Sequence, residues 1–181
     1  MQSMPRRLGL TGVVFTQIRR YEDAARAGRS VPYAEVISLI QLLLRRADAG
    51  AILWETGELM ARRRLERVPG AFVHVVRFLP GAGAGSAARV GRRLLRALSG
   101  GGSVEAHARP FRIRFNDCPL ATLDALGTGC ALYTGALDAT LRAYTGKPVR
   151  AEHTGCRARG HDACEWEATD DDAMASASSA A

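Results

Sequence analysis

Three cysteines and one histidine in the last third of the chain have the residue types and spacing of metal ligands. Cys130, Cys156 and Cys164 are separated by 25 and then 7 residues, and His153 lies three residues before Cys156. Thiolate and imidazole groups are ligands that Zn²⁺ binds in tetrahedral sites. Because four protein ligands leave no position open for a substrate, we expect a structural zinc site rather than a catalytic one.

Other residues near this set compete for the fourth position. His161 lies between Cys156 and Cys164 and is an alternative to His153. Glu152 should point away from His153, because neighbouring side chains of a strand face opposite sides. Cys118 precedes Cys130 by 12 residues, which corresponds to about 18 Å on a continuous helix. We therefore expect Cys118 to lie outside the site, and the choice between the two histidines stays open.

The second half of the chain carries the elements that must position these ligands. Alternation of apolar and polar residues predicts short strands, and a long apolar pattern ending at Gly146 predicts a helix that contains Cys130. The predicted strands cover residues 104–109, 111–115, 149–154 and 164–168, and the helix covers residues 120–144. A metal bound here would tie the last hairpin to the helix, since such a hairpin is marginally stable alone.

The first half of the chain has helical periodicity. Helices are expected over residues 11–28, 32–50, 52–67 and 86–98, with a loop at 80–85, while residues 72–79 fit either a strand or a short helix. The sequence thus predicts an α+β fold, a helical half followed by β-β-α-β-β, with one four-stranded antiparallel sheet. We expect a flexible start at 1–10, one domain over 11–168 and a disordered tail at 169–181.

Composition restricts the possible partners. The 181 residues include 25 basic and 18 acidic ones, a net charge of +7, and Lys147 is the only lysine. The arginines fall on predicted helix ends and polar faces, and no aromatic-rich basic strand is visible, so we expect no direct nucleic-acid binding. The arginine and alanine bias is typical of a GC-rich bacterium. The longest apolar stretch, 36–44, is far shorter than the ~20 residues of a membrane span, and the four cysteines without an apolar leader indicate the cytoplasm.

Two motifs suggest enzymes but lack the right context. Residues 83–88 fit the dinucleotide-binding pattern G-x-G-x-x-A, with Glu105 as the possible ribose ligand. Pro80 interrupts the approach and no strand–helix–strand repeat follows, so we expect a loop with Ser86 as a helix cap. Cys118 with His107 would form a nucleophile and base, yet a turn cysteine is the simpler interpretation. We therefore assign no catalytic residue.

The cysteine spacing resembles the 4-vinyl reductase domain family, and residues 156–164 match it best. That family includes a bacteriochlorophyll-biosynthesis protein and the sensor domains of phenol- and toluene-responsive transcriptional activators, and its fold is related to small subunits of the TRAPP tethering complex. In the phenol sensors zinc is held by Cys, Glu, Cys and Cys. The resemblance places these ligands at Cys130, His153, Cys156 and Cys164, with His153 in place of the glutamate.

The resemblance also implies a function and a partner. It implies a non-enzymatic sensor or carrier domain that binds a small hydrophobic or aromatic molecule, and a homodimer. Alternatives are a bacteriochlorophyll-pathway protein that acts on or delivers a vinyl tetrapyrrole, and a TRAPP-like scaffold subunit. From apolar character and expected position, the candidate pocket walls are Trp54, Phe72, Val75, Phe78, Phe115 and Tyr133.

Overall fold

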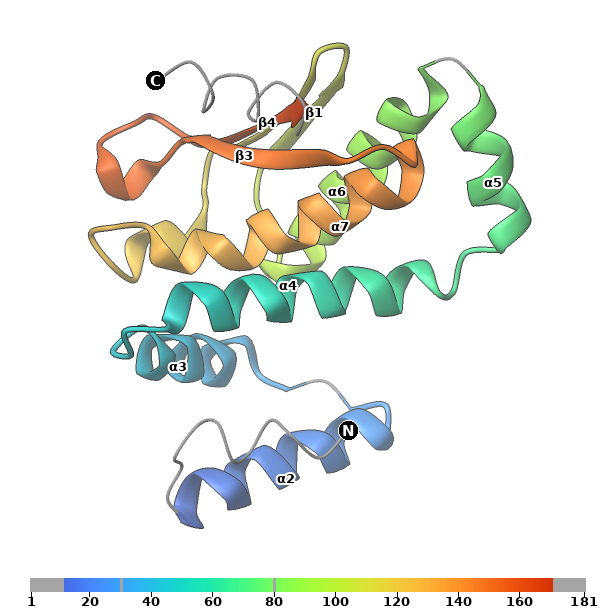
Figure 1. Ribbon diagram of the computed structural model, residues 1–181. Helices are drawn as coiled ribbons and strands as arrows, with labels where there is room; N and C mark the ends of the chain where they lie inside the picture. The colour runs from blue at the N-terminus through green and yellow to red at the C-terminus, as the bar shows by residue number, and fades with distance from the viewer. Residues whose placement is uncertain (1–11, 30, 80, 171–181) are drawn as a thin grey trace. The chain divides into compact units, whose positions relative to one another are not determined.

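The computed structural model describes residues 12–29, 31–79 and 81–170 (Figure 1). The chain divides into two compact units, Met1–Ile40 and Gln41–Ala181. The first unit contains helix α2 (Gly12–Arg26) and most of α3 (Tyr33–Leu43), joined by an ion pair of 3.5 Å between Arg20 and Glu35. The expected flexible start and nearly all of the expected tail lie outside the described residues.

The second unit begins its regular structure with three helices, α4 (Ala49–Leu65), α5 (Gly70–Phe78) and α6 (Ala82–Leu98). Helix α5 settles the ambiguous segment in favour of a helix. Two expected boundaries were wrong. The helix before α4 ends at Leu43 and Gly50 lies inside α4, while the predicted glycine-rich loop is the first turns of α6. Because that segment is helical, it does not form a phosphate-binding loop of the dinucleotide type.

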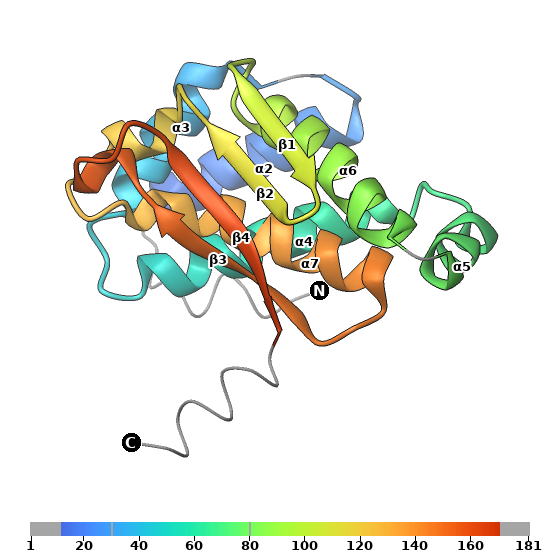
Figure 2. The same cartoon turned by 90° about the horizontal axis from the view of Figure 1, so that it is seen from above.

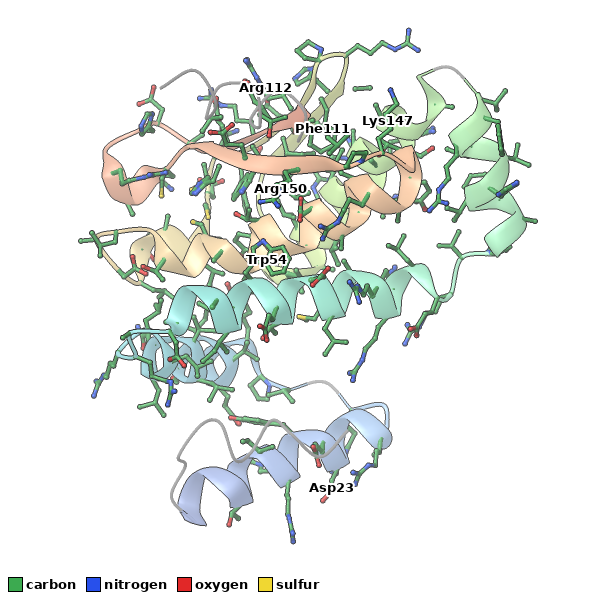
Figure 3. The ribbon with its side chains drawn as sticks, viewed as in Figure 1. Asp23, Trp54, Phe111, Arg112, Lys147 and Arg150 are labelled. Atoms are coloured by element: carbon green, nitrogen blue, oxygen red, sulfur yellow. The ribbon has the colours of Figure 1, made fainter. Side chains whose placement is uncertain are left out.

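The sheet has the predicted four antiparallel strands, β1 (Val104–Ala108), β2 (Phe111–Phe115), β3 (Val149–Gly155) and β4 (Cys164–Asp170), in the order β1-β2-β4-β3. Helices α6 and α7 cover one face of it (Figure 2). The other face carries charged side chains, such as Arg112, which points away from α7 in Figure 3. Arg112 pairs there with Glu167, and Arg114 pairs with Glu165 at 2.6 Å. The expected α+β fold is confirmed.

The long helix predicted over residues 120–144 is shorter than expected. Two 3₁₀ turns, η1 (Pro119–Thr122) and η2 (Thr128–Cys130), precede helix α7 (Ala131–Thr145). Gly127 has a φ of +72° between them, a conformation that side-chain-bearing residues rarely adopt. The chain therefore folds back before α7 begins, and Gly146 ends the helix with a φ of +67°, as predicted.

Helix α4 packs directly against α7 (Figure 1). Their backbones meet at two glycines, because a Cβ atom on Gly57 would collide with the Leu132 carbonyl and one on Gly135 would collide with the Trp54 carbonyl. On the opposite side of α7, Tyr133 packs edge-on against Trp166, with ring centroids 6.1 Å apart. Helix α7 is thus the centre of this unit, between α4 and the sheet.

Candidate metal centre

The four predicted ligands come together at one end of the sheet. The sulfur atoms of Cys130, Cys156 and Cys164 and one ring nitrogen of His153 all lie within 4.8 Å of one another. The Cys130 and Cys164 sulfurs are 3.8 Å apart. Zinc–sulfur bonds of about 2.3 Å give a tetrahedron whose sulfur–sulfur edge is about 3.8 Å. The spacing of this pair therefore suits a tetrahedral zinc ion.

Cys130 is positioned by the turn that starts α7. The Asp124 carboxylate accepts hydrogen bonds from the backbone N–H groups of Thr128 and Gly129, at 3.0 and 3.1 Å, and so fixes η2, whose last residue is Cys130. Gly127 lies against the Cys156 sulfur, where a Cβ atom would collide with it. The glycine therefore lets the turn before α7 approach the last hairpin closely enough for the two cysteines to share one ion.

The last hairpin supplies the other three ligands. Strand β3 is irregular in its pairing with β4 between His153 and Gly155. A short 3₁₀ turn, η3 (Arg157–Arg159), follows. The Cys156 carbonyl accepts hydrogen bonds from the backbone N–H groups of Arg159 and His161, at 3.0 and 3.2 Å. These bonds close the turn, so that Cys156 and Cys164 stand at the two sides of its base.

His153 has the features of a ligand without its ion. Its Nε2 atom is buried and has no hydrogen-bond partner among the described residues. A buried, unpaired polar atom is costly, and a metal ion would satisfy it. The ring is held against the Trp166 indole, with centroids 4.6 Å apart and planes at 13°. The orphan nitrogen and the soft donor set together fit Zn²⁺.

The competitors for the fourth position lie elsewhere. His161 is exposed in the turn after η3 and does not belong to the set of four donors. Glu152 is exposed on the opposite side of β3 from the buried Ala151. Among the described residues, the structure thus brings His153 and neither alternative to the three sulfurs.

Cys118 was wrongly expected to be far away. It is fully buried, and its sulfur lies 3.8 Å from that of Cys130. The error has a clear cause: residues 119–130 form two turns rather than one continuous helix. Gly127 and Gly129 were the available signal, because two glycines so close together weaken a helix. Hydrogen bonds from the Cys130 and Cys164 thiols lower the pKa of Cys118, and the contacts to Cys118 and Cys164, with burial, raise the pKa of Cys130.

The six candidate pocket walls do not gather in one place. Phe115 and Tyr133 are fully buried, with ring centroids 5.6 Å apart, in the core between sheet and α7. Trp54 lies on the side of α4 that faces α7, under the Arg142 guanidinium (Figure 3). The other three are exposed side chains of α5, namely Phe72, Val75 and Phe78.

Sequence reasoning missed a surface cleft between α4, α5 and α7. Its volume is about 480 Å³, and a second cleft of about 470 Å³ adjoins it through shared lining residues. Both clefts are lined by Leu65, Glu66, Arg77 and Ala143. None of the six candidate pocket walls lines either cleft. The cleft has a small apolar floor and a charged rim, which single-residue hydrophobicity could not reveal.

Comparison with known proteins agrees with this architecture. A profile of the 4-vinyl reductase domain matches residues 111–170, the part of the chain that carries the sheet and the four ligands. The resemblance inferred from the cysteine spacing is thereby confirmed, and this part of the chain belongs to the 4-vinyl reductase domain family. No curated protein matched the chain.

A solved structure has the same fold over most of the chain. It is a crystal structure of the phenol-responsive sensory domain of the transcription activator PoxR with phenol, with a TM-score of 0.52 and 15% identity over 82% of this chain and 81% of that one. None of the helices within the described ranges is long and apolar enough to cross a membrane.

Proposed function

We propose that this chain is a small-molecule-binding domain of the 4-vinyl reductase type, a sensor or carrier, whose last hairpin is held by a structural zinc ion. The observation that carries the zinc site is the set of four donor atoms within 4.8 Å of one another, one of them the buried and otherwise unpaired Nε2 of His153. Three thiolates and one imidazole complete a tetrahedron and leave no open position.

The role of the zinc ion follows from where its ligands lie. Cys130 stands at the start of α7, and the other ligands stand on the hairpin of β3 and β4. A bound ion would hold this hairpin to the central helix, and its binding free energy would add to the stability of the fold. We expect the ion to stabilise the domain rather than to take part in a reaction.

The proposed ligand is a small hydrophobic or aromatic molecule. The likeness in fold to a sensory domain that was crystallised with phenol supports a binding role. The cleft between α4, α5 and α7, at about 480 Å³, has the size of sites that hold small ligands, about 300–1,000 Å³. Leu65, Ala139 and Ala143 give it an apolar floor, and the guanidinium groups of Arg62, Arg77 and Arg142 stand around it. An aromatic ring with a phenolic or carboxylate group would suit this lining.

Native mass spectrometry of protein purified without added metal tests the zinc site. We expect one zinc ion per chain and its loss in Cys156→Ser, with a lower melting temperature. A metal-free, fully folded protein would refute the zinc site.

Thermal shifts with phenol and benzoate test the ligand site. We expect Leu65→Trp, which fills the cleft, to abolish the shift and Leu59→Trp, exposed on the same helix, to retain it. No shift with any aromatic compound would contradict the binding role.

A scaffold role is the second candidate, and the outer face of α5 favours it. Phe72, Val75, Phe78 and the adjacent Leu79 are all more than half exposed, although their spacing makes one apolar stripe. We propose that this stripe pairs with the same stripe of a second copy, as in an isologous homodimer. This pairing is compatible with ligand binding, because the cleft lies on another side of α5's junction with α4.

A further inference from the structure

The metal centre contains one sulfur more than a tetrahedral ion with His153 needs. Cys118 lies 3.8 Å from Cys130, and Cys130 lies 3.8 Å from Cys164. The Cys118 thiol also interacts with Cys164. The edge between Cys130 and Cys164 is thus shared by two groups of donors, one with His153 and Cys156, the other with Cys118. Five donors therefore surround a position that takes four.

Cys118 is held in this place by the backbone. It immediately precedes Pro119 and turn η1, which packs against η2, since a Cβ atom on Gly129 would come within 3.0 Å of the Leu120 carbonyl. The same two turns therefore carry Cys118 and Cys130 side by side. A sulfur–sulfur distance of 3.8 Å equals the edge of a tetrahedral thiolate site, about 3.8 Å from bonds of about 2.3 Å.

His153 is the donor that can leave most easily. Its side chain is half-buried, whereas the four cysteines are fully buried. Its ring would keep its contact with Trp166 after release, and the imidazole would exchange the metal for water. Soft metal ions prefer thiolate to imidazole, so the softness of the ion decides between the two donors.

We propose that Cys118 is an alternative fourth ligand, and that this centre binds thiophilic divalent ions such as Cd²⁺ through the four sulfurs of Cys118, Cys130, Cys156 and Cys164. In the exchange the Cys118 thiol loses its proton to water, a metal–sulfur bond forms and the bond to His153 breaks. With Zn²⁺, His153 stays bound and the Cys118 thiol donates a hydrogen bond to a bound thiolate. This inference rests on the proposed metal site and adds a second mode of binding to it.

The test uses the full chain loaded with Zn²⁺ or Cd²⁺ alone, and X-ray absorption counts the sulfur ligands. We expect three sulfurs and one nitrogen around Zn²⁺ and four sulfurs around Cd²⁺ in the wild type. Three sulfurs around both metals would overturn the proposal. These counts need no variant, so they do not depend on whether a substituted chain folds. A wild-type chain that binds neither metal would instead refute the metal site itself.

Two variants separate the donors. His153→Phe keeps a ring against Trp166 but cannot bind metal; we expect it to retain one Cd²⁺ per chain by native mass spectrometry. Cys118→Ser should also retain Cd²⁺, now with three sulfurs. The double variant should lose affinity by at least about 100-fold, beyond the usual effect of groups outside the ligand shell. Loss of Cd²⁺ in a folded His153→Phe, with no change in Cys118→Ser, would contradict the role of Cys118.

Discussion

The imidazole of His153 lies nearly parallel to the indole of Trp166, with ring centroids 4.6 Å apart and planes at 13°. The indole is fixed in turn, because its Nε1 donates a hydrogen bond of 2.9 Å to the Thr134 hydroxyl. The Thr134 hydroxyl donates to the Cys130 carbonyl at 3.2 Å. One ligand of the proposed centre is therefore positioned by a side chain that is anchored beside another.

This relationship predicts the effect of replacing the indole. We expect Trp166→Leu to weaken zinc binding by about 10–100-fold, because His153 loses the surface that orients its ring. Competition with a chromophoric chelator measures the affinity. The matched control is Trp54→Leu, a tryptophan on α4 outside the metal centre, which should leave zinc affinity unchanged. Equal affinities in both variants would show that the stacking has no positioning role.

The crossing of α4 and α7 predicts a large effect of a single methyl group. Gly57→Ala would drive a Cβ atom into the Leu132 carbonyl. Such overpacking against backbone costs about 1–3 kcal/mol or more, so the urea midpoint should fall clearly. Gly50→Ala lies in the same helix, where its Cβ would meet Thr128 at an ordinary 3.5 Å. That control should be neutral or stabilising by about 0.4–1 kcal/mol. A Gly57→Ala variant as stable as Gly50→Ala would contradict the backbone contact.

Asp138 predicts a pH dependence of stability. Its side chain is 3% exposed, and burial raises the pKa of this carboxyl, with the Ala151 N–H and the Arg142 charge offsetting part of the rise. A carboxyl whose pKa is higher in the folded state holds more protons there, so its contribution to stability falls as pH rises through that pKa. Asp138→Asn should therefore gain on the wild type as pH rises from the ordinary carboxyl range through the raised pKa.

Urea unfolding of both proteins at a series of pH values measures this difference. The comparison cancels the titration of groups that the two proteins share. The substituted asparagine side chain retains a carbonyl oxygen for the Ala151 N–H, which the Asp138 carboxylate accepts at 3.0 Å, so the hydrogen bond to β3 remains possible. A difference that does not change with pH would show that burial of Asp138 does not disfavour its ionised form.

The exposed face of α5 predicts a change in oligomeric state. Phe78 is 75% exposed, and we expect Phe78→Ser to shift the proposed dimer towards monomer in light scattering coupled to size-exclusion chromatography. Leu126 is 80% exposed but lies in the turns before α7, so Leu126→Ser should leave the mass unchanged. An unaltered dimer in Phe78→Ser, or a monomeric wild type, would rule out pairing through α5.

Local patterns predicted most of the elements. Alternation identified the strands, because a half-exposed strand must change face at each residue, and helical periodicity identified α4 and the body of α7. The errors fall where contacts distant in sequence override local preference. The glycine-rich start of α6 reads as a loop, yet Gly83 and Gly91 pack closely on α7, and a Cβ atom at either would come within 2.7 Å of that helix. A sequence does not show which neighbour a small residue serves.

The sequence by itself determined the donor types of the candidate centre, the hairpin that carries three of them and the α+β class of the fold. These are local properties of spacing and periodicity. Only the tertiary structure decided between His153 and His161, because strand register aims one ring at the sulfurs and leaves the other in an exposed turn. Only the tertiary structure brought in Cys118, because the fold-back at Gly127 shortens a distance that sequence separation makes long.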